Sequence, residues 1–154
     1  MSEKREQAVE LFKKGYNCAQ AVLCPFASDF QLSLNDAFRI SCGFGGGMAR
    51  TQMTCGAVTG AIMAIGLKYG NPGDEPFEKI KLNTYGPVRA FMEEFKKKYN
   101  ALDCKTLMGG LDMNNPEEQK IIKEKNLHST FCTYCVGDAV SILETLFSEP
   151  AQQG

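Results

Sequence analysis

Apolar residues recur at steps of three and four along the start of the chain. Over residues 3–23 they form the stripe of one amphipathic helix, although Gly15 weakens that pattern. Pro25 stops or bends the chain after this stretch. Ser33 then opens a run of cap residues before a second, short helix over residues 36–41.

Further helical stretches follow, and each has a start or stop signal. They cover residues 51 or 54 to 67, 76–99, 116–126, and 129 or 130 to 147. The second of these is expected to kink or break at Gly86-Pro87, because proline removes a helical hydrogen bond. No alternating segment is long enough to build a sheet. The pattern predicts one all-α domain over residues 1–154, a bundle of about five or six helices with a glycine-rich loop.

The glycine-rich loop lies between the second and third predicted helices. Four glycines in five positions, residues 43–47, exclude a helix there. A dinucleotide fingerprint fails because Met48 or Arg50 stands where its last glycine is needed. We therefore expect a flexible loop that lets Cys42 and Cys55 reach a common site.

The helix after Cys55 has a face of small residues, which another backbone or a cofactor could approach closely. Either this face or the glycine-rich loop could also form a contact between two copies of the chain. The glycines expected to contact a cofactor are Gly45, Gly46, Gly47 and Gly56.

Charge and hydropathy narrow the class of protein. Lys and Arg number 17 against 18 Asp and Glu, a net charge of −1, so nothing marks the chain for nucleic acid. The longest weakly polar run, residues 53–67, is shorter than the roughly 20 residues that a membrane span needs. The charged start does not resemble a secretory signal. We expect a soluble, cytoplasmic protein without a membrane span.

Seven cysteines are the unusual feature of the composition. They are too few for a disulfide scaffold, and cysteines in a reducing compartment more often bind metal or perform redox chemistry. In C-T-Y-C (132–135), the spacing puts Cys132 and Cys135 on one face of a helical turn. If Ser129 or Thr130 caps that helix, its dipole lowers the pKa of the Cys132 thiol, which suits metal ligation and thiol redox chemistry.

Five segments extend this pattern along the chain. They read G-Y-N-C-A-Q-A-V (15–22), G-G-G-M-A-R (45–50), C-G-A-V-T-G-A (55–61), C-K-T-L (104–107) and C-x-x-x-V-x-x-A (132–139). The series resembles the redox-active family named for four cysteines and a C-G-A-x-x-G motif, over about residues 15–146. That family is similar to the cysteine-rich part of split-Soret cytochromes, which carry an iron–sulfur centre.

The resemblance implies that the family's four cysteines are Cys18, Cys55, Cys104 and Cys132. Four thiolates are the number that an iron–sulfur cluster or a tetrahedral zinc ion requires. The remaining cysteines, Cys24, Cys42 and Cys135, are extras, of which Cys42 and Cys135 are the substitutes if one ligand is misassigned. A covalent c-type haem is excluded, because Val136 stands where C-x-x-C-H needs histidine.

The hypothesis that follows is electron transfer through a cysteine-ligated iron–sulfur centre, with an unidentified redox partner protein. A thiol–disulfide oxidoreductase and a structural zinc module are the alternatives. His128 is close in sequence to Cys132 and could be a further ligand, a proton donor or a solvated loop residue. Arg50 could offset the charge of a thiolate cluster or face water.

Overall fold

The computed structural model describes residues 2–149 apart from residue 75. This part of the chain is helical, and its one β feature is an isolated bridge between Thr54 and Asp103. The all-α prediction is confirmed. The α-helices outnumber the five or six expected, because several are only one or two turns long. They are α1 (Glu3–Lys13), α2 (Cys18–Leu23), α3 (Leu34–Ser41), α4 (Gly56–Tyr69), α5 (Phe77–Ile80), α6 (Gly86–Tyr99), α7 (Cys104–Leu107), α8 (Pro116–Glu124) and α9 (Thr133–Ser148).

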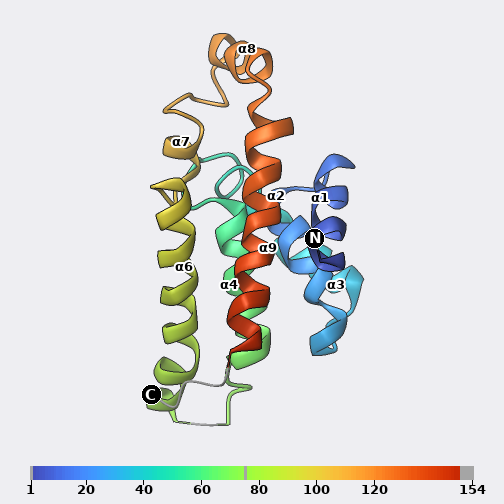
Figure 1. The fold of residues 1–154 in the computed structure, drawn as a ribbon, viewed down its shortest axis with the longest axis vertical. Helices are drawn as coiled ribbons and strands as arrows, with labels where there is room; N and C mark the ends of the chain where they lie inside the picture. Colours follow the sequence, from blue (N-terminus) through green and yellow to red (C-terminus); the bar gives the residue numbers. More distant parts are fainter. Residues whose placement is uncertain (1, 75, 150–154) are drawn as a thin grey trace.

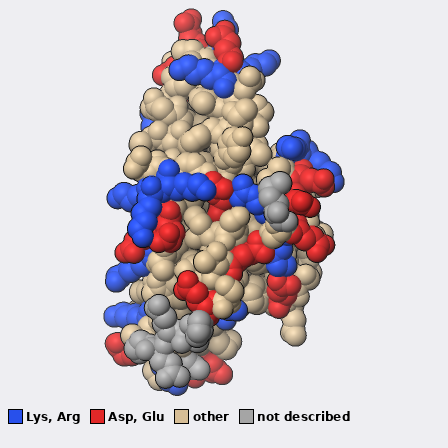
Figure 2. Space-filling view, in the orientation of Figure 1, with Lys and Arg blue, Asp and Glu red and all other residues tan. Residues whose placement is uncertain are grey.

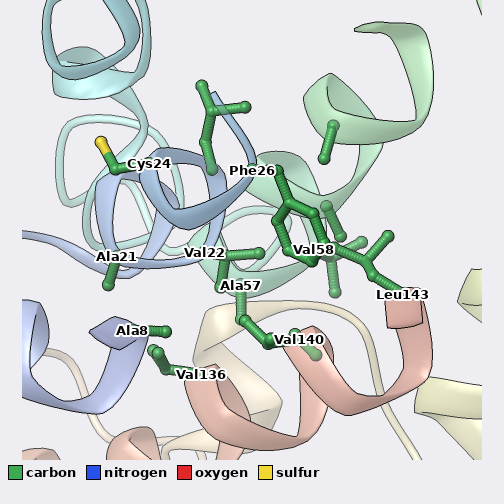
Figure 3. Packing of buried hydrophobic residues seen from close by; sticks show 14 of the residues in the cluster. Ala8, Ala21, Val22, Cys24, Phe26, Ala57, Val58, Val136, Val140 and Leu143 are labelled. Carbon is green, nitrogen blue, oxygen red and sulfur yellow. The ribbon is translucent and has the colours of Figure 1, made fainter. Parts of the chain in front are cut away.

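Helices α4, α6 and α9 run alongside one another and form the long axis of the molecule (Figure 1). Helices α1, α2 and α3 cover one side of this group, with α2 against α4 and α1 against α9. The main core lies between these layers, where Val22, Val58, Val140 and Leu143 are fully buried (Figure 3). Cys24 belongs to the same packed cluster.

The first predicted helix is wrong in one respect, because it is split in two. Gly15 takes a left-handed conformation, with φ of 103°, and ends the run after α1. Asn17 then begins α2: its side chain accepts from the backbone of Gln20, whose side chain accepts from the Asn17 backbone. This reciprocal cap fixes Cys18 as the first residue of α2.

A kink or break was expected at Gly86-Pro87, and the helix type changes there although the helical run continues over residues 77–99. Helix α5 continues into a π-helical turn over Lys81–Tyr85, and α6 then begins at Gly86 with Pro87 in its first turn. Proline suits this position, because the first turn of a helix has backbone N–H groups without helical partners. Helix α3 also agrees with its prediction, since the Ser33 side chain caps it.

Two predicted caps are wrong. Cys55 occupies the N-cap position of α4, in place of Thr51 or Thr54, and no side-chain hydrogen bond caps the helix. Ser129 and Thr130 do not cap α9, because both hydroxyls donate to the carbonyl of Asn126. They lie within a π-helical turn, Leu127–Cys132, that leads directly into α9.

Acidic and basic side chains are interspersed over the face that Figure 2 shows, and neither sign forms a continuous patch there. A mostly uncharged area lies between the top of this face and its middle. None of the described helices is long and apolar enough to cross a membrane.

Candidate functional site: a cavity lined by cysteines

Six of the seven cysteines line one cavity of about 750 Å³. They are Cys18, Cys42, Cys55, Cys104, Cys132 and Cys135. All seven are free thiols. Cys24 does not line this cavity: it directly follows α2, is buried in the core and packs as a small apolar side chain. The structure therefore brings together the four motif cysteines and both of the proposed substitutes.

Each motif cysteine stands at or next to the beginning of a helix. Cys18 and Cys104 are the first residues of α2 and α7, Cys55 is the N-cap of α4, and Cys132 directly precedes α9. A helix N-terminus presents backbone N–H groups and the positive end of the helix dipole. The beginnings of α2, α4 and α7 thus direct partial positive charge toward one group of sulfurs, whereas Cys132 joins the π-helical turn Leu127–Cys132 to α9.

Cys55 and Cys104 are fixed to one another through the backbone. The bridge between Thr54 and Asp103 pairs the residues immediately before them. The Cys55 N–H donates to the carbonyl of Leu102 at 2.8 Å, and the Cys104 N–H donates to that of Met53 at 2.6 Å. Both sulfurs are consequently placed by hydrogen bonds of the main chain, and both residues are buried.

The glycines of the motif permit close approach to the cysteines. A Cβ on Gly56 would lie 2.9 Å from the Cβ of Cys18, and a Cβ on Gly47 would lie 2.8 Å from that of Cys104. Real side chains do not tolerate such contacts, so both positions require glycine. Gly45, Gly46, Gly47 and Gly56, the glycines expected at a cofactor, all line the cavity.

The glycine-rich loop is not the open, flexible loop expected from its composition. Residues 46–50 form five consecutive left-handed positions, with φ of 64°, 69°, 68°, 51° and 63°. Three of them, Met48, Ala49 and Arg50, carry side chains, for which this conformation costs about 1–2 kcal/mol each. Such strain persists only where surrounding contacts enforce it, and it is concentrated at functional sites.

The contacts that hold this left-handed turn come from the loop over residues 111–114. The Arg50 guanidinium donates to the carbonyl of Met113 at 3.0 Å, and the Asn114 side chain donates to that of Arg50 at 2.8 Å. The buried Gln52 side chain bonds Leu111 and Met113 on the same loop. Arg50 is thus engaged in a structural contact while it also lines the cavity.

The pKa values of the cavity thiols are raised, and burial is the largest cause. The pKa of Cys104 and that of Cys132 are each raised to about 12, by burial and then by the like charges of neighbouring cysteines. The prediction of a lowered pKa for Cys132 is therefore wrong, because it ignored burial and the other sulfurs. The same two effects raise the pKa of Cys18.

Cys55 has the clearest local stabilisation of a thiolate. Burial raises its pKa, but hydrogen bonds from the backbone N–H groups of Ala57 and Val58 oppose that shift. Both N–H groups belong to the first turn of α4, where no side chain makes a capping hydrogen bond and the Val58 N–H donates to the Cys55 carbonyl at 2.9 Å. Their arrangement favours a negatively charged sulfur at Cys55.

His128 lies at the edge of the cavity. Its Nδ1 atom is 3.8 Å from the sulfur of Cys132, one turn along the π-helical segment. The pKa of His128 is lowered, first by partial burial and then by the charge of Arg50. A neutral imidazole therefore faces Cys132, and it can exchange a hydrogen bond with that sulfur.

A model of one protein family matches residues 16–146, and its description reads "Putative redox-active protein (C_GCAxxG_C_C)". The chain belongs to this family. The matched range includes Cys18, Cys55, Cys104 and Cys132, which line the cavity. The family name writes G-C-A-x-x-G, where this member has C-G-A-V-T-G at residues 55–60.

A relative in Archaeoglobus fulgidus is 28% identical over 122 residues, which are 75% of this chain and 81% of the relative. That protein is described only as uncharacterized. No solved structure matches the chain.

Proposed function

We propose that this redox-family member transfers electrons through an iron–sulfur centre held by Cys18, Cys55, Cys104 and Cys132. The observation that carries the proposal is the convergence of these four thiols on one cavity, from four separate helix beginnings. Iron–sulfur clusters are held in proteins by cysteine thiolates, commonly four. When bound, such a cluster supplies one-electron oxidation and reduction.

The surroundings of the thiols fit a negatively charged group. The beginnings of α2, α4 and α7 contribute partial positive charge. The backbone N–H groups of Ala57 and Val58 act to lower the pKa of Cys55 and so favour a thiolate there. Hydrogen bonds to cluster sulfurs are one of the means by which a protein sets the reduction potential. Gly56 on α4 and Gly47 in the left-handed turn have no side chain, so the main chain at both positions would lie close to a bound cluster.

The spacing of the thiols favours a polynuclear centre over a single zinc ion. Zinc draws its four sulfurs to about 2.3 Å. Over the described residues, no three Cys, His, Asp or Glu side chains converge closely enough to hold one metal ion. The thiols instead line a cavity of about 750 Å³, and we expect a group larger than one ion to bind between them.

The raised thiol pKa values count against a thiol–disulfide oxidoreductase. A nucleophilic cysteine needs a lowered pKa, so that the thiolate is present at neutral pH. The pKa of Cys104 and that of Cys132 lie near 12, which leaves these thiols protonated until a metal displaces their protons. The environment thus supports metal-dependent chemistry more strongly than direct attack by sulfur.

A reductive titration tests the electron-transfer function. Anaerobically purified protein is titrated with dithionite and then reoxidised, while visible and electron paramagnetic resonance spectra are recorded. We expect a visible absorption that bleaches and recovers reversibly, with a paramagnetic signal in one of the two states. A colourless protein that takes up no electrons, or that takes them up only by opening a disulfide, contradicts the proposal.

A further inference from the structure

The cavity that holds the cysteines has room and lining for more than a metal centre. Its volume of about 750 Å³ lies within the range of about 300–1,000 Å³ that small-molecule sites have in proteins. Metal–thiolate bonds are short, about 2.3 Å for zinc, so a metal centre lies against the sulfurs that hold it. Much of the lining consists of side chains other than thiols, and this part of the cavity is left for a second occupant.

Two aromatic side chains line the cavity from segments far apart in the sequence. Tyr16 lies between α1 and α2, and Phe131 belongs to the π-helical turn before α9. Each ring packs on a neighbour that does not line the cavity: the ring centroids are 4.6 Å apart for Tyr16 and Phe38, and 5.5 Å apart for Phe131 and Tyr99. Because these contacts hold both rings before anything binds, the aromatic lining is preorganised.

The charged side chains that line the cavity are positive. Lys13, the last residue of α1, and Arg50, in the left-handed turn, both line it, and none of its described lining residues is acidic. Over the described part of the chain, neither side chain forms an ion pair with a carboxylate. Arg50 donates to the neutral carbonyl of Met113 at 3.0 Å, which orients the guanidinium and leaves its charge uncompensated. The lining therefore complements an anion.

These cations lie on the solvent side of the sulfurs. Lys13 and Arg50 are exposed and Tyr16 is 40% exposed, whereas Cys55 and Cys104 are buried. A molecule that enters from solvent consequently meets the ring of Tyr16 and the two positive charges before it reaches the buried thiols.

We propose that the outer part of this cavity, lined by Lys13, Tyr16, Arg50 and Phe131, binds a small organic anion with a flat apolar body. The two aromatic rings contact the body of the ligand, and the two cations pair with its acidic group. This inference goes beyond the proposed function, which assigns no small molecule to the cavity. It does not depend on the nature of the metal centre, because none of the four residues is a proposed metal ligand.

Equilibrium dialysis of β-naphthoate against the anaerobically purified protein tests this site. Naphthoate has a flat apolar body and one carboxylate, and β-naphthamide is the matched neutral ligand of the same shape. The chain contains no tryptophan, so indole emission does not obscure the fluorescence of the naphthalene ring. We expect saturation at about one naphthoate per chain and an affinity for the amide that is about two- to fivefold lower, as for an exposed ion pair.

Variants of the lining assign the charge and the ring contact separately. Lys13→Gln should weaken naphthoate binding about two- to fivefold and leave naphthamide binding unchanged. Lys14→Gln is the matched control, since the neighbouring Lys14 does not line the cavity. Tyr16→Ala should weaken binding of both ligands about three- to tenfold, whereas Tyr134→Ala, at an exposed tyrosine outside this cavity, should weaken neither. Circular dichroism checks that each variant keeps its helices.

Protection of Cys42 locates the bound probe. Cys42 is exposed, lines the same cavity and is not one of the four proposed ligands. Naphthoate should slow its alkylation by iodoacetamide, as measured by mass spectrometry of the Cys42 peptide. Lys13 also lines a neighbouring pocket between α1 and the π-helical turn. Binding that depends on Lys13 but leaves the alkylation of Cys42 unchanged would place the probe in that pocket and overturn the inference.

Three other results would also overturn it. They are no naphthoate binding at concentrations on the order of millimolar, equal affinities for naphthoate and naphthamide, and equal losses in Lys13→Gln and Lys14→Gln. These failures are distinct from a failure of the proposed function. A protein that contains iron and sulfide but binds no naphthoate keeps the electron-transfer centre without the small-molecule site. A protein that contains no iron but binds naphthoate with the expected dependence on Lys13 and Tyr16 keeps the small-molecule site without the centre.

Discussion

Gly60, the last residue of the C-G-A-x-x-G segment, allows α2 to lie directly on α4. A Cβ at this position would lie 2.6 Å from the carbonyl oxygen of Ala19 and 3.0 Å from its Cα. Both are backbone atoms, so no side-chain rotation relieves the contact. Gly66 in the same helix is the matched control, because a Cβ there has no neighbouring atom within 4 Å.

The two alanine substitutions should change stability in opposite directions. Replacing a glycine inside a helix by alanine stabilises by about 0.5–1 kcal/mol, which is the full effect expected for Gly66→Ala. At Gly60 the same gain is opposed by an overpacking cost of about 1–3 kcal/mol, at the upper end because backbone must move. Gly60→Ala should therefore lose about 1–2 kcal/mol, and the variants should differ by about 2–3 kcal/mol.

Thermal unfolding of the metal-free, reduced proteins measures this difference. At about 2–4 °C per kcal/mol for a chain of this size, the midpoints should lie about 4–12 °C apart. Ala19 adjoins Cys18, so Gly60→Ala should also lower iron content, whereas Gly66→Ala should not. Equal midpoints, or a Gly60→Ala protein more stable than the parent, would show that α2 does not lie on α4 as described.

Three further predictions concern the turn, the ion pair and the thiols. Gly47→Ala should abolish iron binding through its contact with Cys104, whereas Gly109→Ala, at a similar positive φ but in open space, should cost only about 1–2 kcal/mol and retain iron. Arg5→Ala should destabilise by about 2–4 kcal/mol at pH 7 in urea unfolding. Because the pKa of Asp138 is lowered, the ion pair contributes to stability above pH ~4 and this contribution is lost in acid. If Arg5→Ala were destabilised as much below pH ~3 as at pH 7, the effect could not come from the pair with Asp138. Because the pKa of Cys104 is raised to about 12, its contribution to stability is present below pH ~8.5 and is lost above it. The urea midpoint of the metal-free protein should therefore fall between about pH 8 and 10, and it should fall less in Cys104→Ala. A midpoint that does not change with pH would refute the thiol assignment.

The helical class could be predicted from the sequence, because the spacing of apolar residues is a repeated local signal. The convergence of the cysteines was predicted from the resemblance of five segments to a known family. The spacing of apolar residues located α3, α6 and α8 to within a few residues. The split before Cys18 was also readable, since Asn17 and Gln20 form a capping box. The split was missed because apolar residues continue at helical spacing on both sides of it.

Other features depend on contacts between distant segments and have no local signal. Met48, Ala49 and Arg50 favour right-handed conformations. They are held left-handed by backbone hydrogen bonds within the turn and by the distant loop over residues 111–114. The pKa of Cys132 was mispredicted for the same reason, because burial and the other sulfurs outweigh any helix dipole. The bond between Tyr99 and Asp138 joins α6 to α9 across 39 positions of the chain, which no motif reports.

The most direct test of the central claim is iron and acid-labile sulfide per chain in anaerobically purified protein and in its cysteine variants. The four single substitutions to serine at the motif cysteines are compared with Cys24→Ser, the buried cysteine outside the cavity. We expect a brown parent that contains iron and sulfide, loss of both in each motif variant, and full retention in Cys24→Ser. A parent that remains free of iron and sulfide after anaerobic reconstitution, or motif variants that retain as much as Cys24→Ser, would contradict an iron–sulfur centre at this cavity.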